Sequence, residues 1–350
     1  MTKRSLLIGT ALAIAFASIG YGSSRFWAYL VYAVAISSIG AMSLNLLIGF
    51  CGQITFAQGA LIGVGAYAAA NLGNAGWGGL VALLGAGMFG ALTSALIGLP
   101  AMRLRGLYFA ISTLAAQFIL SYFFKLLEPL TNGVSGLVVK PLVLFGRTVK
   151  GDQEYAVICV VVLYLSWIFL SRLTRTNVGR AFLVIRESEL VARGMGIDVA
   201  RTKMQAFLIS GFFAGLCGGL LAFTSRLASP EAFEISLSVD QTAMIIVGGL
   251  GSLAGSVVGA IFVALLPEAI QRFGELLPSA ALVSAFREMA FGILIILFLL
   301  LEPRGLVALG QRLWRRQRNE TTEKAADLPS NATNENDVNS AIPALEGRKV

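Results

Sequence analysis

The sequence predicts an all-α polytopic membrane protein with about ten membrane helices, some of them broken or re-entrant. Two features of the composition lead to this prediction: 56% of the 350 residues are hydrophobic and only 13% are charged, whereas soluble domains carry roughly 25% charged residues. The third feature is local, because residues 26–102 contain no Asp, Glu, Lys or Arg. Since a spanning helix needs about 20 apolar residues, that stretch alone is long enough for about three crossings.

The apolar segments define the predicted crossings in order. Residues 5–19, which follow Lys3 and Arg4, form either a retained spanning helix or a cleaved signal with an A-x-A-like site. The uncharged run 241–267 would be roughly 40 Å long as a single helix. Glycines interrupt this run, so we predict two short or broken segments within it. The remaining predicted spans are residues 26–48, 54–72, 78–100, 107–127, 155–171, 204–224 and 289–301.

The distribution of Lys and Arg predicts the topology, because short cytoplasmic loops are enriched in these residues. With the N-terminus inside, six crossings return the chain to the cytosol at Arg172, and the basic cluster after Pro303 is then cytosolic as well. Both termini are therefore predicted to be cytoplasmic. The formal net charge of +8 follows from this topology and does not indicate a nucleic-acid partner.

Residues 172–203 form a water-soluble insert between two apolar segments. Seven Lys or Arg residues against three Asp or Glu place it in the cytosol. Asn177 suits an N-cap, Glu189 and Arg193 are spaced for an i,i+4 ion pair, and residues 194–196 (GMG) suit a helix stop. These features predict one helix over residues 178–193, with Asp198 capping the next helix.

Two glycine-rich breaks, at residues 49–53 (GFCGQ) and 248–252 (GGLGS), each precede an apolar helix. Paired glycine-interrupted segments in the two halves of a transporter indicate its pathway. Close helix packing explains the same glycines, and the two interpretations are compatible. The uncharged polar residues near the spans have two interpretations as well, as the lining of a polar conduit or as hydrogen-bonding partners between helices. The candidate pathway residues are Asn45, Gly52, Gln53, Gln58, Gln117, Gly249 and Gly251.

The sequence contains no pattern that indicates a catalytic, nucleotide-binding or metal site. It contains no histidine and no G-x-x-x-x-G-K-[ST] phosphate loop, which excludes histidine-dependent catalysis and ATP hydrolysis by this chain. Cys51, Cys159 and Cys217 are far apart and are interpreted as apolar packing residues. No catalytic residue, metal site or cofactor is therefore predicted.

Several motifs occur in the order found in a known family. They are residues 45–60 (NLLIGFCGQITFAQGA), 63–67 (GVGAY), 103–108 (RLRGLY), 130–137 (LTNGVSGL) and 248–252, and within the insert 177–181 (NVGRA), 185–190 (IRESEL) and 195–201 (MGIDVAR). Together with residues 291–306, they resemble the permease subunits of branched-chain amino-acid ABC importers, specifically the M-type of the two permeases. The resemblance covers roughly residues 26–308.

The resemblance implies the architecture, location and partners of an ABC importer permease. The chain would lie in a bacterial cytoplasmic (inner) membrane and form half of a pathway with a second permease subunit. Two ATPase subunits would dock on the cytoplasmic loops, and an extracytoplasmic solute-binding protein would deliver the substrate. The insert would transmit ATP-driven closure to the spans through Gly179, Arg180, Ala181, Arg186, Glu187, Glu189, Met195 and Gly196.

Two domains are predicted, a transmembrane domain over residues 1–310, with the insert inside it, and a disordered cytoplasmic tail over 311–350. The alternative functions are a permease for amides or urea, which uses a similar subunit, and a self-contained secondary carrier. A polytopic membrane enzyme would need clustered acidic or metal-binding residues, and the sequence does not show them.

Overall fold

The computed structural model describes residues 25–102, 104, 106–144, 146–274, 289 and 292–293. These residues are mainly helical, as predicted. The long helices are α2 (Arg25–Asn45), α3 (Gln58–Asn74), α4 (Gly79–Gly98), α5 (Leu107–Leu126), α7 (Asp152–Leu173), α8 (Asn177–Glu187), α10 (Val199–Ser225), α11 (Ile235–Gly248) and α12 (Leu253–Gly274). The short helices are η1 (Leu46–Phe50), η2 (Leu99–Met102), α6 (Glu128–Thr131), η3 (Gly133–Ser135), α9 (Glu189–Gly194) and η4 (Pro230–Phe233).

Two antiparallel strand pairs of two residues each lie in the loops, a detail that the all-helical prediction did not contain. Strand β1 (Leu137–Val138) pairs with β4 (Leu227–Ala228), with Leu137 opposite Ala228. Strand β2 (Val143–Leu144) pairs with β3 (Arg147–Thr148). The first pair ties the loop after α5 to the end of α10.

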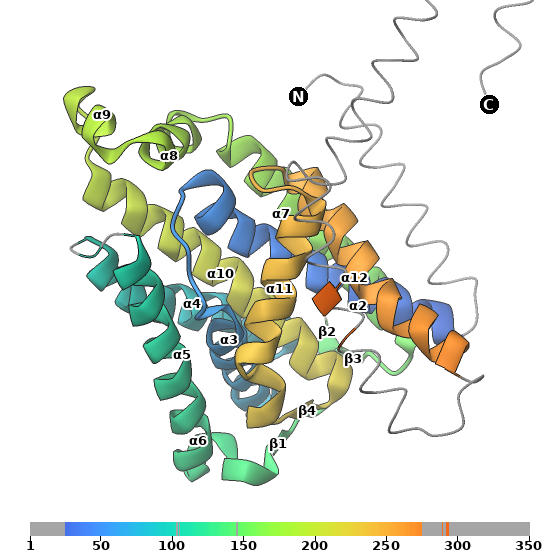
Figure 1. The fold of residues 1–350 in the computed structure, drawn as a ribbon. Helices are drawn as coiled ribbons and strands as arrows, with labels where there is room; N and C mark the ends of the chain where they lie inside the picture. The colour runs from blue at the N-terminus through green and yellow to red at the C-terminus, as the bar shows by residue number, and fades with distance from the viewer. Residues whose placement is uncertain are drawn as a thin grey trace, which may run out of the picture. The chain divides into compact units, whose positions relative to one another are not determined.

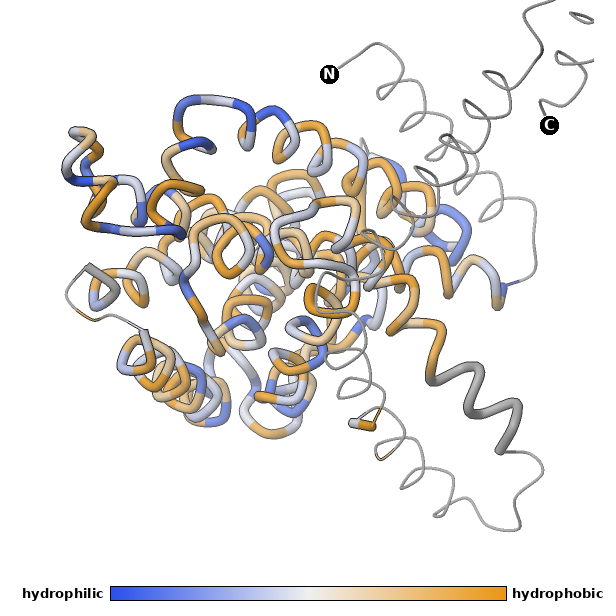
Figure 2. The backbone as a smooth tube through the Cα atoms, turned by 45° about the horizontal axis from the view of Figure 1, so that its top comes forward, coloured by the Kyte–Doolittle hydropathy of each residue, from blue (hydrophilic) through white to orange (hydrophobic). Residues whose placement is uncertain are grey.

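Five described helices are long and apolar enough to cross a membrane, and the number rises to six if the bent pair α11–α12 counts as one span. They are Arg25–Phe50, α4, α5, α7 and α10. Figure 2 shows apolar colours along most of the helices and hydrophilic colours in many of the segments that connect them. The all-α polytopic class is confirmed, whereas the predicted total of about ten extends beyond the described residues.

The chain alternates between two ends of the helix bundle (Figure 1). One end carries η1, α8, α9 and the turn between α11 and α12, and is named the α8 end. The other carries the last turn of α3, α6 and the β1–β4 pair, and is named the α6 end; there Asn71 donates to the Leu130 carbonyl at 2.8 Å. This alternation matches the order of crossings predicted from the sequence.

Helix α10 is the central element and packs against both α3 and α4. Glycines make this contact close. A methyl group at Gly215 would overlap the Ala86 carbonyl of α4, and one at Gly218 would overlap the Ile62 carbonyl of α3. Small residues at such crossings allow backbones to approach, which replaces the hydrophobic driving force that is missing between helices in lipid. Helices α3, α4 and α10 thus form a scaffold against which the broken segments lie.

Several predictions concern residues outside the described part of the chain. They are the segment 5–19, Arg103 and Arg105, the span 289–301, the basic cluster after Pro303, the domain boundary at residue 310 and the tail 311–350.

Candidate functional site

The two glycine-rich breaks meet at the α8 end of the bundle, and Asn45 joins them. Its side-chain oxygen accepts a hydrogen bond from the Gly251 N–H at 2.8 Å. Its Nδ2 donates to the Ser252 carbonyl at 2.9 Å and to Ser256 Oγ at 2.7 Å. Asn45 is completely buried, and its amide supplies the Gly251 N–H with an acceptor, a partner that backbone groups at a break in a membrane segment otherwise lack.

Each break has a local cause in its glycines. After α2 the chain forms the π-helix η1 and turns at Gly52, whose φ is 72°. Helices α11 and α12 are bent by 119°, and between them Gly249 and Gly251 have φ values of 122° and 79°. Residues with a Cβ rarely adopt these values. The predicted breaks at residues 49–53 and 248–252 are therefore present.

Arg186 of the insert connects α8 to both breaks. Its Nη1 donates to the Gly49 carbonyl. A methyl group at Gly251 would lie 2.9 Å from the same nitrogen, and one at Gly52 would lie 3.1 Å from Arg186 Cα. Asn45, Gly49, Arg186 and Gly251 are named the Arg186 junction. At this junction the soluble insert contacts the two places where the membrane segments are interrupted.

The insert itself differs from the predicted single helix over residues 178–193. Thr176, and not Asn177, is the N-cap of α8, and its side chain accepts from the Gly179 N–H. The chain becomes extended at Ser188, with φ −163° and ψ 119°, and Ser188 then caps the separate helix α9 by accepting from the Val191 N–H. A serine side chain competes well for backbone N–H groups, which favours a new helix start over continuation.

The predicted cap at Asp198 is present, since its carboxylate accepts from the Arg201 N–H at 3.1 Å. The i,i+4 pair of Glu189 and Arg193 also forms, at 3.9 Å. A stronger partner, however, is Lys203 of α10, whose Nζ lies 2.5 Å from Glu189 Oε1 and whose side chain is only 2% exposed. Breaking such a buried pair leaves an uncompensated charge, so this contact anchors α9 to the scaffold helix.

Four apolar side chains of the insert are exposed at the α8 end. Leu190 is 81% exposed and Met195 is 67% exposed, and Leu183 and Val191 are exposed as well. Arg180 and Glu187 of α8 are exposed as well. Apolar side chains that cluster on a polar connecting segment, away from the spans, indicate a surface for another protein. These four apolar residues, Leu183, Leu190, Val191 and Met195, are named the insert face.

The predicted coupling residues separate into two groups. Arg180, Glu187, Met195 and Gly196 are exposed and Ala181 is half-buried. Arg186 is exposed as well but donates to the Gly49 carbonyl, and the half-buried Glu189 pairs with Lys203. Gly179 is buried, and a methyl group there would lie 2.5 Å from Thr174 Cα. The sequence interpretation omitted Leu183, Leu190 and Val191, although exposed leucine and valine in a charged insert are a usable signal. It also omitted Gly49, Lys203 and Ser256, whose partners are distant in sequence.

The predicted pathway glutamines Gln58 and Gln117 lie inside the subunit, where they form hydrogen bonds at the start of α3. Gln117 of α5 accepts from the Ala60 N–H at 2.7 Å and donates to the Phe233 carbonyl at 2.9 Å. Gln58 donates to Ser43 Oγ at 2.7 Å, and both glutamines are fully buried. Ser238 of α11 donates to Gln117 Oε1 at 3.4 Å, and its Oγ accepts from the Gly59 N–H at 2.7 Å. Two backbone N–H groups in the first turn of α3 thus find their acceptors on α5 and α11. In this arrangement the two glutamines hold helices together.

Gln53 is buried as well, in the extended segment between η1 and α3. Its neighbour Ile54 is 51% exposed. Backbone without helical hydrogen bonds is tolerated at membrane depth only where it is covered by protein or lines a water-filled cavity. Gly52 and Ile54 are exposed on either side of the buried Gln53, so this extended segment is covered by protein on one side only.

Two polar atoms near Gln58 lack a partner within the described part of the chain. They are Gln58 Oε1 and Gln241 Oε1. Gln241 Oε1 lies close to Gly40 of α2, and Gln58 Nε2 donates to the Gly40 carbonyl at 3.2 Å. Among the described residues, no group of three or more His, Cys, Asp and Glu side chains is arranged to hold a metal ion. All three cysteines are buried and free.

A family model described as "Branched-chain amino acid transport system / permease component" matches residues 26–299. The high-affinity branched-chain amino acid transport system permease protein LivM of Escherichia coli (strain K12) is 30% identical over 291 residues, which cover 76% of this chain and 66% of the relative. LivM of Salmonella typhimurium (strain LT2) shows the same identity and coverage. The xylose transport system permease protein XylH of Escherichia coli (strain K12) is 34% identical over 116 residues, or 31% of this chain and 29% of XylH.

The chain therefore spans slightly less than two thirds of the length of the two LivM relatives, at 66% of each. No solved structure matches it.

Proposed function

Because this chain belongs to the family of permease components of branched-chain amino acid transport systems, we propose that it is a membrane-spanning subunit of an ATP-driven importer for branched-chain amino acids. It forms half of the translocation pathway and couples to separate ATPase subunits. The family is a transport family, so the chain is a permease and not an enzyme. ATP hydrolysis is assigned to the partner subunits.

The observation that carries the proposal is the Arg186 junction. A permease without a nucleotide site of its own needs a mechanical connection between a docked ATPase and its pathway. Arg186 sits on the soluble insert and donates to the carbonyl of Gly49 in one broken segment, beside Gly251 of the other. A displacement of α8 would therefore act on two backbone interruptions that meet at Asn45. If these contacts have two arrangements, a small shift of α8 is converted into a change of state.

The insert face is proposed as the docking surface for the ATPase subunit. Leu190 and Met195 are more than half exposed, and they lie on α9 and at its end, where Glu189 and Lys203 anchor the insert to α10. The exposed Arg180 and Glu187 provide charged positions beside this face. In this assignment the α8 end is cytoplasmic, both chain termini are cytoplasmic, and the membrane is the bacterial inner membrane.

The proposed transporter contains a second permease subunit and an extracytoplasmic solute-binding protein. The described spans contain few ionisable residues, so they provide no fixed counter-charge for a strongly charged solute. A zwitterion whose charges largely cancel suits such a path. Selectivity among leucine, isoleucine and valine then belongs to the binding protein, and Gln53 with its exposed neighbours provides a weakly binding route.

Uptake by cells lacking only this subunit tests the proposed function. Import of leucine, isoleucine and valine is expected to be lost and to return when the subunit is supplied. Loss of amide, urea or xylose uptake with unchanged amino-acid uptake would contradict the substrate assignment. Uptake by the purified chain alone, driven by an ion gradient in proteoliposomes, would contradict the ATP-driven mechanism.

Co-purification of the ATPase tests the docking surface. Leu190→Glu places a charge on the insert face and is expected to reduce the ATPase recovered with the permease at least tenfold. Arg147→Glu, an exposed position at the α6 end, is the matched control and should recover the wild-type amount. Equal recovery from both variants would remove the insert face from the interface.

A further inference from the structure

A second group of polar side chains lies at the α6 end, at the opposite end of the helix bundle from the insert (Figure 1). Lys125 at the end of α5 and Glu234 at the start of α11 form an ion pair, with Lys125 Nζ 3.1 Å from Glu234 Oε1. Their side chains are 42% and 46% exposed. The pair therefore joins the two helices that both contact α3, and water reaches both charges.

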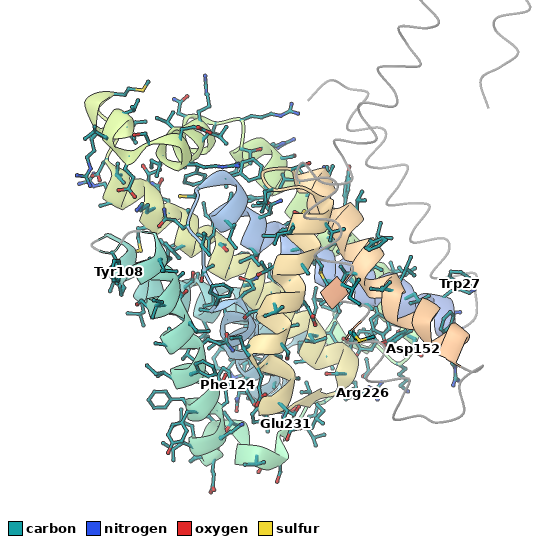
Figure 3. All side chains as sticks on the ribbon, in the orientation of Figure 1. Trp27, Tyr108, Phe124, Asp152, Arg226 and Glu231 are labelled. Atoms are coloured by element: carbon teal, nitrogen blue, oxygen red, sulfur yellow. The ribbon has the colours of Figure 1, made fainter. Side chains whose placement is uncertain are left out.

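An aromatic cluster lies directly behind this ion pair. Phe124 precedes Lys125, Phe233 precedes Glu234, and both rings pack on Tyr67 of α3 with centroid distances of 5.0 Å and 5.9 Å. All three side chains are at most 5% exposed. Figure 3 labels Phe124 on α5 and Glu231 just before α11, both at the α6 end. Gly63 of α3 makes room for this cluster, since a methyl group there would lie 2.7 Å from the Phe124 ring.

The hydroxyl group of Tyr67 has no hydrogen-bond partner among the described residues, although it is buried. An orphaned buried hydroxyl is costly, so a partner such as a bound ligand or an ordered water is expected for it. The Tyr67 ring packs on Phe124 and Phe233, the residues directly before Lys125 and Glu234, whose charges are already partly exposed. A separation of the two phenylalanine rings would therefore add the Tyr67 hydroxyl to a cation and an anion that solvent already reaches.

We propose that Lys125, Glu234 and Tyr67 form a recognition site for a zwitterionic amino acid at the extracytoplasmic entrance of the pathway. The α-carboxylate of the substrate pairs with Lys125 and its α-ammonium group pairs with Glu234, so one ion pair is exchanged for two. The Tyr67 hydroxyl hydrogen-bonds to the same polar end, and the aliphatic side chain contacts Phe124 and Phe233. This inference rests on the proposed function, because it takes the α6 end as extracytoplasmic.

The chemistry of the site distinguishes amino acids from the alternative substrates. Amides and urea carry neither charge, so they gain nothing from separating Lys125 and Glu234. Every amino acid carries both charges, so the site selects a substrate class and not one side chain. The half-exposed ion pair is weakly held because water screens it, which suits a contact that opens in each transport cycle.

Uptake by the complete transporter, at saturating substrate and with equal amounts of assembled complex, tests the proposal. Lys125→Gln and Glu234→Gln are each expected to lower the maximal uptake of leucine, isoleucine and valine at least fivefold and by the same factor for all three. Tyr67→Phe is expected to lower uptake at least threefold while the protein stays as stable or becomes more stable, because a purely structural tyrosine would lose nothing with its orphaned hydroxyl. Lys140→Gln and Glu154→Gln, other charged positions at this end, are the matched controls.

The exchange variant Lys125→Glu/Glu234→Lys distinguishes a pair that binds the substrate from a pair that only holds α5 and α11 together. It restores an ion pair with reversed polarity, so uptake should remain low if the substrate reads the charges in a fixed orientation. Recovery of wild-type uptake would show that the pair only braces the helices and would overturn the site. Undiminished leucine uptake in both glutamine variants would overturn the site alone, whereas wild-type transport of a neutral amide in place of leucine would overturn the site and the proposed function together.

Discussion

The two ends of the helix bundle are held together by opposite kinds of contact. At the α8 end, the buried Asn45 amide bonds to three residues of the glycine-rich break and to Ser256, and Arg186 donates to a backbone carbonyl. At the α6 end, a half-exposed ion pair covers three aromatic rings, one of which carries an orphaned hydroxyl. Separating the first arrangement leaves the Gly251 N–H unpaired, whereas water can replace the half-exposed ion pair of the second. We therefore expect the first arrangement to move as a unit and the second to open more readily.

The strongest test of this difference is the removal of the Asn45 amide. Asn45→Leu leaves the Gly251 N–H without its partner, whereas the Ser252 carbonyl keeps its hydrogen bond from the Ser256 N–H. One unpaired group in this part of the protein costs roughly 1–3 kcal/mol, so we expect a loss of about 2 kcal/mol in the free energy of unfolding and no uptake. Asn71→Leu is the control at the α6 end, where Asn71 is only half-buried and donates to two carbonyls. Denaturation of both variants in detergent should show a clearly smaller loss for Asn71; equal losses would end the distinction between the two ends.

A second test introduces a side chain at the turn between α11 and α12. Gly249 has φ 122° and ψ 119°, and a non-glycine residue in such a conformation costs on the order of 1–3 kcal/mol. Gly249→Leu is therefore expected to abolish uptake while the complex still assembles. Gly151→Leu provides the control, because Gly151 has an ordinary extended backbone and open space around it. Normal transport by Gly249→Leu would mean that the turn lies outside the moving part of the protein.

The sequence was sufficient to predict the two glycine-rich breaks and the insert at the α8 end. It did not predict that these three segments contact one another. Glycine runs indicated both breaks, and the charge excess indicated the insert, because these signals are local. Asn45 and its partners, by contrast, are separated by more than 200 residues, and no periodicity in one chain reveals such a pairing. The misplaced cap at Asn177 is a one-residue error between two good capping residues. The break at Ser188 was missed because its only signal is a serine before an acidic residue, a helix start inside an apparent helix.

The α6 end was harder to predict. Lys125 lies near the end of the predicted span 107–127, where charged residues normally serve as interfacial anchors, and Glu234 lies in the predicted connection between the spans 204–224 and 241–267. Tyr67 lies in a run of small residues that indicates close packing. Only the fold brings α5 and α11 to the same side of α3, and only the fold shows that the Tyr67 hydroxyl is left without a partner.

A third test separates coupling from stability at the Arg186 junction. Arg186→Gln removes the cation that donates to Gly49. We expect ATP hydrolysis by the assembled transporter to continue while uptake per ATP falls about tenfold, which corresponds to about 1.4 kcal/mol. Arg175→Gln alters an exposed arginine of the same insert that lies outside the junction and should transport normally. A parallel fall of hydrolysis and uptake in Arg186→Gln would show that Arg186 supports ATPase docking and does not transmit motion.

The smallest change in stability is expected at the α6 end, and there the contrast between the two ends becomes quantitative. Exposed ion pairs contribute about 0–1 kcal/mol, because water screens the charges and ordering the side chains costs entropy. Lys125 and Glu234 are 42% and 46% exposed, so Lys125→Gln should change the free energy of unfolding by less than about 1 kcal/mol. Raising the salt concentration should weaken the wild-type pair further without unfolding the protein. A loss as large as that of Asn45→Leu would mean that the ion pair is a fixed brace, and both ends would then be held in the same way.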